Sequence, residues 1–118
     1  MKVKDVTTPA GNPMVSVIMP VRNEDLFIRR SLGALLRQTY PGNRMEVIVA
    51  DGMSTDGTRE TIREIAANSE IPIVIVDNPK LIAPTGLNRA LEKARGDIVI
   101  RVDGHCEVDS GYVENCVS

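Results

Sequence analysis

The sequence predicts an α/β fold, a parallel Rossmann-like sheet with flanking helices. Two observations lead to this prediction. Four short runs of β-branched residues alternate with segments whose apolar residues recur at helical spacing. The runs are also nearly continuous in apolar residues, which is typical of parallel strands covered on both faces. Strands that alternate with helices in this way form a parallel sheet with right-handed crossovers.

The predicted strands end at turn residues. They cover residues 15–19, 45–50, 71–76 and 97–102. Pro20 ends the first strand, and Asp51 with Gly52 ends the second. Pro72 has no amide donor, so we expect it at the start of its strand or at a sheet edge.

The first predicted helix places four apolar residues on one side. These are Ile28, Leu32, Leu35 and Leu36, at positions i, i+4, i+7 and i+8. We expect Asn23 to cap this helix, with Glu24 and Asp25 in its first turn, and Pro41 with Gly42 to stop it.

Three further helices follow the same reasoning. The second covers 58–67 and buries Ile62, Ile65 and Ala66. The third begins near Thr85 and closes on Gly96, which we expect to adopt a left-handed conformation. Its apolar side consists of Leu87, Ala90, Leu91 and Ala94. A fourth helix begins near Tyr112.

Composition excludes several functions. The chain of 118 residues has 14 Lys and Arg against 16 Asp and Glu, a net charge of −2. It therefore lacks the basic surface that binds a phosphate backbone, and we expect no nucleic acid partner. Trp is absent and aromatic residues make up 3%, so stacking platforms are missing and a ligand must be held by polar groups.

The number of cysteines and the length of the apolar segments indicate the cellular compartment. Cys106 and Cys116 are too few for a disulfide framework and lack the spacing of a zinc finger, which indicates two reduced thiols. No apolar stretch of signal-peptide or transmembrane length occurs. We therefore expect a cytoplasmic protein.

Ligands of parallel sheets bind beyond the carboxyl ends of the strands. This rule selects four loops, which are rich in Asp, Asn, Gly or His: 20–25, 51–57, 78–86 and 103–107. In the second loop, Asp51 at the end of a strand could accept hydrogen bonds from a ribose or a base. The alternative is that this loop only caps the following helix, and Asp56 fits that role better than ligand binding.

Three known nucleotide and signalling motifs are missing. The position of a G-x-G-x-x-G fingerprint after the first strand reads Pro-Val-Arg-Asn-Glu, and no P-loop occurs. A phospho-receiver domain could use Asp77, but the acidic pair that it needs near the first strand is absent.

Asp103-Gly104-His105 follows the fourth strand. A carboxylate and an imidazole two residues apart can share a divalent cation and a diphosphate, and with phosphate oxygens they suit Mn²⁺ or Mg²⁺. The alternative is that His105 is only a surface or turn residue.

Four segments together resemble a family 2 glycosyltransferase with the GT-A fold. In order, they are Val-Ser-Val-Ile-Met-Pro-Val-Arg-Asn-Glu at 15–24, Val-Ala-Asp-Gly-Met-Ser-Thr-Asp-Gly-Thr at 49–58, Gly-Leu-Asn-Arg-Ala at 86–90 and Gly-Asp-Ile-Val-Ile-Arg-Val-Asp-Gly-His at 96–105. The second and fourth are most similar to those of succinoglycan-type exopolysaccharide glucosyltransferases.

The resemblance implies a UDP-sugar donor and assigns residues to it. Pro20, Asn23 and Glu24 would line the nucleoside pocket, and Asp51 would lie near the uridine. Asn88 would lie by the diphosphate or the donor sugar.

The metal side of the implied site rests on two residues. Asp103 would contact ribose or metal, and His105 would stand where the second Asp of the family's D-x-D element ligates Mn²⁺ or Mg²⁺. Many members of the family also carry a second Asp where this chain has Gly52.

The resemblance further implies that the chain is a part of a larger domain. We expect residues 1–13 to be an N-terminal extension and 14–118 to be the nucleotide-sugar-binding part, truncated before the acceptor half. The catalytic base, which would activate a glycan or lipid-linked acceptor for inverting transfer at the cytoplasmic face of a membrane, is then expected beyond Ser118. The alternative is a stand-alone module that binds a nucleotide without turnover. An open sheet edge could also pair with a second copy.

Overall fold

The computed structural model describes residues 2–3, 12–80 and 83–118. Its sheet has the strand order β1-β5-β2-β3-β4. The strands are Lys2–Val3 (β1), Val15–Val21 (β2), Met45–Asp51 (β3), Ile73–Asp77 (β4) and Ile98–Arg101 (β5). Strands β2 to β5 run parallel, and β1 pairs antiparallel with β5. The predicted α/β fold with a parallel sheet is confirmed.

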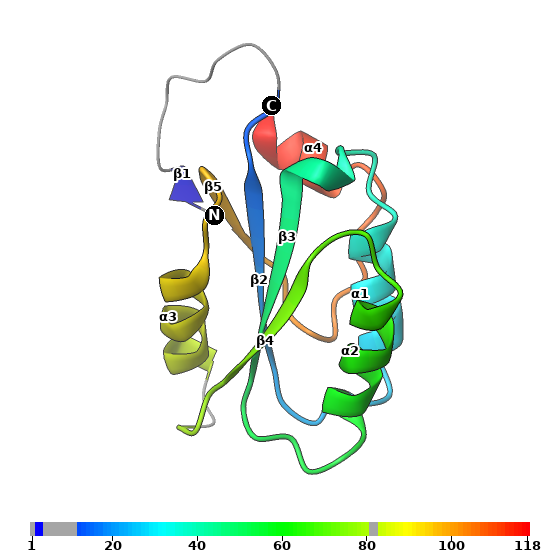
Figure 1. The fold of residues 1–118 in the computed structure, drawn as a ribbon, viewed down its shortest axis with the longest axis vertical. Coiled ribbons are helices and arrows are strands. Elements are labelled where there is room, and N and C mark those ends of the chain that lie inside the picture. Colours follow the sequence, from blue (N-terminus) through cyan, green and yellow to red (C-terminus); the bar gives the residue numbers. More distant parts are fainter. Residues whose placement is uncertain (1, 4–11, 81–82) are drawn as a thin grey trace.

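Helices cover both faces of the sheet. They are α1 (Ile28–Leu36), α2 (Thr58–Ala67), α3 (Ala83–Lys93) and α4 (Tyr112–Val117), with a short 3-10 helix at Gly42–Arg44. Helices α1 and α2 lie together on one side of the sheet and α3 lies on the other (Figure 1). Within the described ranges, none of these helices has the length and apolar character needed to cross a bilayer.

Strand β2 shows how the sheet separates two cores. Val17 and Met19 are fully buried in the larger cluster, which includes side chains of α1 and α2. Ile18 belongs instead to a smaller cluster with Ala90 of α3. This alternation follows from the two-residue period of a strand, and burial on both faces explains why the run reads as continuously apolar.

The apolar sides of the helices are mostly those predicted. Ile28, Leu32 and Leu35 of α1 and Ile62 of α2 are fully buried. Leu91 is an exception, because 40% of it is exposed. Helix α3 packs through Ala90, and the next residue is turned by about 100° toward solvent.

The expected cap of α1 is wrong. The helix begins at Ile28, so Asn23, Glu24 and Asp25 precede it and its first turn contains no acidic residue. Asn23 has a φ of 52°, and its side-chain oxygen accepts a hydrogen bond from the backbone N of Thr55, 2.8 Å away. The side chain is therefore used to join two loops and not to cap the helix.

Gly96 has a different role from the one predicted. Its φ lies outside the left-handed region, so backbone conformation does not require glycine. A Cβ at this position would lie 2.6 Å from both the backbone N and Oγ of Ser16 and 2.9 Å from the carbonyl oxygen of Met14. Glycine is needed because two segments of backbone approach each other closely here.

The buried acid Glu46 lies at the same end of the sheet as Gly96. Glu46, at the start of β3, accepts hydrogen bonds from Ser16 Oγ at 2.6 Å and from the backbone N of Arg95 at 2.8 Å. Burial by itself would raise the pKa of Glu46, but the hydrogen bonds from Ser16 and Arg95 outweigh burial and lower it. Ser16 Oγ also accepts from the backbone N of Gly96, so the network joins β2, β3 and the segment before β5.

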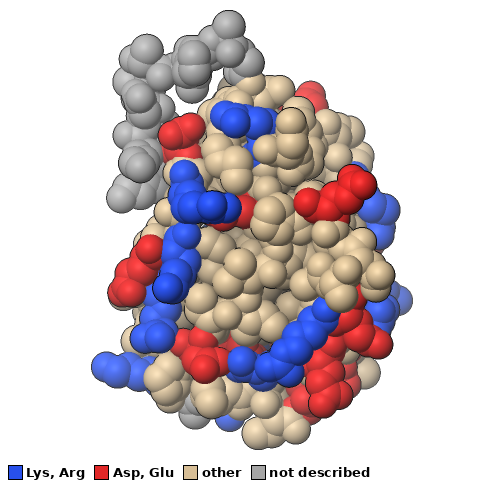
Figure 2. Space-filling model, in the orientation of Figure 1, with Lys and Arg blue, Asp and Glu red and all other residues tan. Residues whose placement is uncertain are grey.

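The two edges of the sheet differ from the expectation. Pro72 directly precedes edge strand β4, as predicted, but Val74 in that strand is 47% exposed, so β4 is not covered on both faces. Figure 2 shows an uncharged surface on the face turned toward the viewer, bordered by charged side chains. On the other edge, Lys2 and Val3 pair with β5, and a strand of two residues leaves no periodic signal in the sequence. Residues 1 and 4–11 of the predicted extension lie outside the described residues.

Candidate functional site

The loops selected from the sequence as candidate ligand-binding loops include three that lie at one end of the sheet. Strands β3 and β4 follow on one side of β2, and β5 lies on its other side, so the strand order reverses between β2 and β5. Ligands of open parallel sheets bind at such a switch point, beyond the carboxyl ends of the strands. In Figure 1 the loops after β2, β3 and β4 lie at the lower end of the molecule, away from the marked C-terminus.

The loops after β2 and β3 are joined by hydrogen bonds. Asn23 donates its backbone N–H to Ser54 Oγ at 2.9 Å, and the backbone N of Glu24 donates to Thr58 Oγ1 at 2.9 Å. Arg22 Nε donates to the carbonyl oxygen of Gly52, also at 2.9 Å. The loop after β2 therefore has a fixed position relative to the loop after β3.

Asp51, the last residue of β3, is completely buried. Its Oδ1 accepts from Ser54 Oγ at 2.5 Å, and its Oδ2 accepts from the backbone N of Ser54 at 3.2 Å and from Arg59 at 2.7 Å. The carboxylate is thus paired within the protein, and a ligand could reach it only by sharing or replacing one of these partners.

Arg59 connects the ends of two strands. Besides Asp51, it binds Asp77 at the end of β4, with 2.7 Å between Nη2 and Oδ1. The hydrogen bonds to Asp77 and Asp51 raise the pKa of Arg59 above its ordinary value, so the guanidinium stays charged. Asp77 is 58% exposed, and this ion-pair network therefore runs from a buried carboxylate to the surface.

Asp56 has the capping role that the sequence predicts. Its Oδ1 accepts hydrogen bonds from the backbone N and from Oγ1 of Thr58, the first residue of α2. The Thr58 hydroxyl is the largest influence that lowers the pKa of Asp56. Gly57 occupies the N-cap position itself and makes no side-chain contribution.

The turn after β5 brings together three residues of types that can ligate a metal. One ligand atom from each of Asp103, His105 and Cys106 lies within 4.8 Å of the others. Asp103 also pairs with Arg101 through Oδ1 at 2.9 Å. The donor set of oxygen, nitrogen and sulfur fits a divalent cation.

Glu24 joins this turn to the loop after β2. Its Oε2 lies 3.0 Å from Nδ1 of His105, although 81 residues separate the two in the chain. Through Ser54, Asn23 is also linked to Asp51. The described contacts therefore bring five of the predicted residues to one end of the sheet: Asn23, Glu24, Asp51, Asp103 and His105.

The other two predicted residues are placed differently. Pro20 lies in β2, paired in register with Ala50, and is partly buried. Asn88 is exposed on α3 and lines a cavity of about 210 Å³ with Asn78, Pro79, Lys80, Thr85 and Arg89. This cavity lies between the end of β4 and α3, and none of the residues that line it belongs to the turn after β5.

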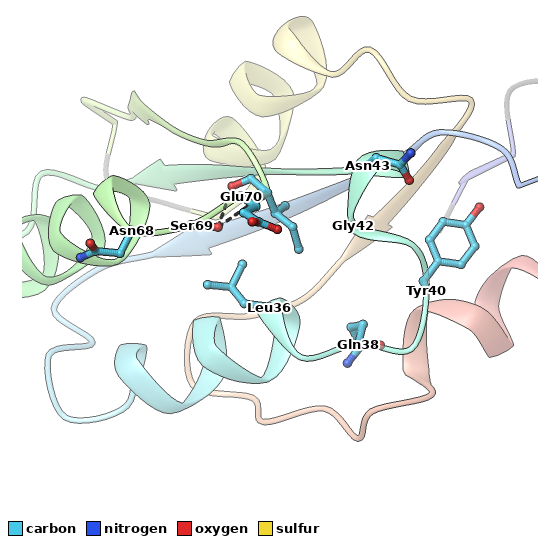
Figure 3. A pocket seen from close by; sticks show the side chains of 9 residues that line it. Leu36, Gln38, Tyr40, Gly42, Asn43, Asn68, Ser69 and Glu70 are labelled. Carbon is cyan, nitrogen blue, oxygen red and sulfur yellow. Dashed lines mark hydrogen bonds between the residues drawn. The ribbon is translucent and has the colours of Figure 1, made fainter.

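A larger cavity, of about 460 Å³, lies at the opposite end of the sheet. Figure 3 shows its lining, which includes Leu36, Gln38, Tyr40 and Ser69. Two of the polar side chains here have partners within the protein: Gln38 Oε1 accepts from the backbone N of Val113, and Ser69 Oγ donates to the carbonyl of Ile71. The shape of this cavity reflects packing at the amino ends of β3 and β4.

Sequence reasoning missed three residues of the candidate site. Ser54 and Arg59 bind Asp51, and Cys106 lies beside Asp103 and His105. Cys106 directly follows Asp-Gly-His, and this adjacency was a usable signal. Arg59 gave none, since an arginine in a first helical turn is common on exposed surfaces.

Comparison with known proteins identifies the family of this chain. Residues 16–118 match the family model described as Glycosyl transferase family 2. The chain is 38% identical over 104 residues to the succinoglycan biosynthesis protein ExoA of Rhizobium meliloti, and the match covers 86% of this chain and 31% of ExoA.

Two solved structures are similar in fold. The mannosyltransferase PcManGT from Pyrobaculum calidifontis, in complex with GDP-Man and Mn²⁺, is 34% identical with a TM-score of 0.76, over 88% of this chain and 31% of that protein. TarS 1-349 of S. aureus, in complex with UDP-GlcNAc, is 25% identical with a TM-score of 0.77, over 87% and 30%. The sheet with its flanking helices thus matches GT-A transferases, and the chain spans about a third of the length of these relatives.

Proposed function

Because this chain belongs to glycosyl transferase family 2, we propose that residues 14–118 form the nucleotide-sugar-binding part of a glycosyltransferase with a UDP-linked donor. The observation that supports this most is the meeting of three strand-end loops at the switch point of the sheet, joined by Asn23 to Ser54 and by Glu24 to His105. Loops held in this way give a polar site with little further ordering on binding.

The proposed donor contacts follow the family motifs. They are made by Pro20, Asn23, Glu24, Asp51, Asn88 and Asp103. Asp51 lies near the uridine in this proposal, and the exposed position of Asn88 beside its cavity suits a contact to the diphosphate or the donor sugar. The likeness to TarS in complex with UDP-GlcNAc supports UDP as the nucleotide. PcManGT is in complex with GDP-Man, so GDP is the nucleotide to compare with UDP in a binding experiment.

Asp103 and His105 would hold Mn²⁺ or Mg²⁺, since their ligand atoms are close enough to share one cation. A bound cation would supply charge that stabilises the leaving diphosphate. Transfer also needs an acceptor site and a general base, which we place in the portion of the relatives' length that this chain does not span. The proposed reaction is inverting transfer to a glycan or lipid-linked acceptor in polysaccharide biosynthesis, at the cytoplasmic face of a membrane.

Calorimetry with UDP and with GDP, each with and without Mn²⁺, tests the proposal. We expect UDP to bind and Mn²⁺ to strengthen the binding, with no sugar transfer from UDP-glucose by this chain. Glu60→Gln, a neutralised acid on the exposed side of α2, is the control and should bind like the parent. Absence of metal-dependent heat at millimolar nucleotide in the folded protein would contradict the proposal. Tighter binding of GDP would overturn only the choice of base.

A further inference from the structure

We propose that Cys106 joins Asp103 and His105 as a third ligand of a divalent cation, with Glu24 as a positioning residue. This centre favours Zn²⁺ and Co²⁺ over Mg²⁺. The inference rests on the proposed function only in placing the cation beside a donor diphosphate. The ligand atoms of the three residues already lie within 4.8 Å of one another. Bonds of about 2.0 to 2.3 Å separate two ligands of a tetrahedral site by roughly 3.5 Å, so side-chain rotations can close the cluster.

The turn that carries these residues is held from several sides. The backbone N of Cys106 donates to the carbonyl of Asp103 at 3.0 Å, which brings the first and last ligand together. The buried hydroxyl of Ser31 donates to the carbonyl of Gly104 at 2.7 Å. A Cβ on Gly104 would lie 2.6 Å from Cγ1 of Val21, so the turn packs directly against the end of β2. A site with a fixed backbone loses less entropy when it binds a cation.

Glu24 orients the imidazole. Its Oε2 lies 3.0 Å from Nδ1 of His105, and the Glu24 side chain is only 19% exposed against 59% for His105. With Nδ1–H donating to the carboxylate, the lone pair of Nε2 remains for a cation. Histidines that bind metals usually donate their other ring nitrogen to a carboxylate or carbonyl in this way.

The donor set determines the class of cation. Mg²⁺ prefers oxygen ligands in octahedral geometry, whereas thiolate and imidazole suit Zn²⁺ and Co²⁺. Arg101 holds Oδ1 of Asp103, and Oδ2 is the second oxygen that a cation can take. Three protein ligands leave a fourth position open, and a diphosphate oxygen can fill it.

Titration of the protein with Co²⁺ in the absence of nucleotide tests Cys106 directly. A thiolate bound to Co²⁺ gives a near-ultraviolet charge-transfer band, which we expect in the parent. Cys106→Ser should abolish this band and lower Co²⁺ affinity about tenfold or more, with Mg²⁺ affinity nearly unchanged. Cys116→Ser is the matched control and should keep the band, because Cys116 lies on α4 outside the cluster.

Glu24→Gln tests the positioning role. We expect it to weaken Co²⁺ binding by about 10- to 100-fold while the charge-transfer band survives at saturation. A second measurement is alkylation of Cys106, which Zn²⁺ should slow and Mg²⁺ should not. A parent protein without the band, or one whose band survives Cys106→Ser, would overturn the inference. Metal-dependent UDP binding without the charge-transfer band would reject the inference and leave the proposed function standing. A charge-transfer band without nucleotide binding would support the inference and contradict the proposed function.

Discussion

Glu46 and Asp51 stand at opposite ends of β3, and each is a buried carboxylate that binds an arginine and a serine. Glu46 is at the amino end of the strand. It accepts hydrogen bonds from Ser16 Oγ and from the backbone N of Arg95, and Ser16 Oγ in turn accepts from the backbone N of Gly96. We interpret this end of the sheet as structural.

Asp51 is at the carboxyl end, and its surroundings are different. Its partner Arg59 continues to Asp77, which is mostly exposed, and its partner Ser54 also accepts from Asn23 in a neighbouring loop. Both networks reach an exposed side chain, since Arg95 is 72% exposed, but only the network of Asp51 joins loops that follow strands. Both acids are buried and both bind an arginine and a serine, so we use their position along the parallel strands to distinguish a structural acid from a candidate binding residue.

The largest effect is expected at the structural end, from Gly96→Ala. The new Cβ would lie 2.6 Å from the backbone N of Ser16, which cannot move without disturbing β2. We expect the free energy of unfolding to fall by about 2 to 4 kcal/mol, measured by urea denaturation. Gly111→Ala is the control, because the nearest atom to its Cβ is 3.7 Å away. Equal stability of the two variants would contradict the close approach at Gly96.

Glu46→Gln tests the charge in the same network. At neutral pH we expect a loss of about 1 to 3 kcal/mol in the free energy of unfolding, because a charge-assisted acceptor is removed. The pKa of Glu46 is lower in the folded protein than its ordinary value of 4.5. Its stabilisation is therefore fully present above that value and is lost as the pH falls through the lower, folded pKa.

The measurement is the stability difference between the parent and Glu46→Gln across this pH range. The difference should shrink as the solution becomes more acidic than pH 4.5. A difference that stays constant or grows in acid would show that Glu46 is not held as a carboxylate by Ser16 and Arg95.

Asp51→Asn should act on binding as well as on stability, because the carboxylate is buried and paired with Arg59. We expect UDP affinity to fall about tenfold, with or without Mn²⁺, because the proposed nucleoside contact does not involve the cation. Calorimetry checks this, with Glu46→Gln as the matched variant at the other end of β3, which should bind UDP like the parent while it remains folded. Unchanged affinity in Asp51→Asn would favour the alternative that this loop only caps α2.

Asp77→Asn should have the smallest effect. The ion pair with Arg59 is short, but Asp77 is 58% exposed, and exposed pairs contribute about 0 to 1 kcal/mol. Arg59 also keeps its contact to Asp51. A loss in thermal denaturation as large as that of Glu46→Gln would mean that the carboxyl end of the sheet is as structural as the amino end.

The sequence predicted the elements well and the contacts between loops poorly. Continuous runs of β-branched and apolar residues located β2 to β5, and apolar periodicity located the buried residues of α1, because both patterns report directly on which sides of an element are covered. Asn23 was misread as a cap because its actual partner, Thr55, is 32 residues away in the chain. The same limit hid Ser16 as the neighbour of Gly96, 80 residues away, since local pattern carries no information on which segments meet. Arg59 is only eight residues from Asp51 and was missed because an arginine in a first helical turn is common on exposed surfaces.

The central claim is that the carboxyl ends of the strands bind the nucleotide and the opposite end does not. Backbone amide NMR of the chain, titrated with UDP and diamagnetic Mg²⁺, tests it most directly. We predict the largest shift changes at residues 22–24, 52–58 and 103–106, with little change at Ser16, Glu46 or the lining of the cavity in Figure 3. Changes concentrated at Gln38, Asn43 and Ser69 in that cavity would contradict the claim.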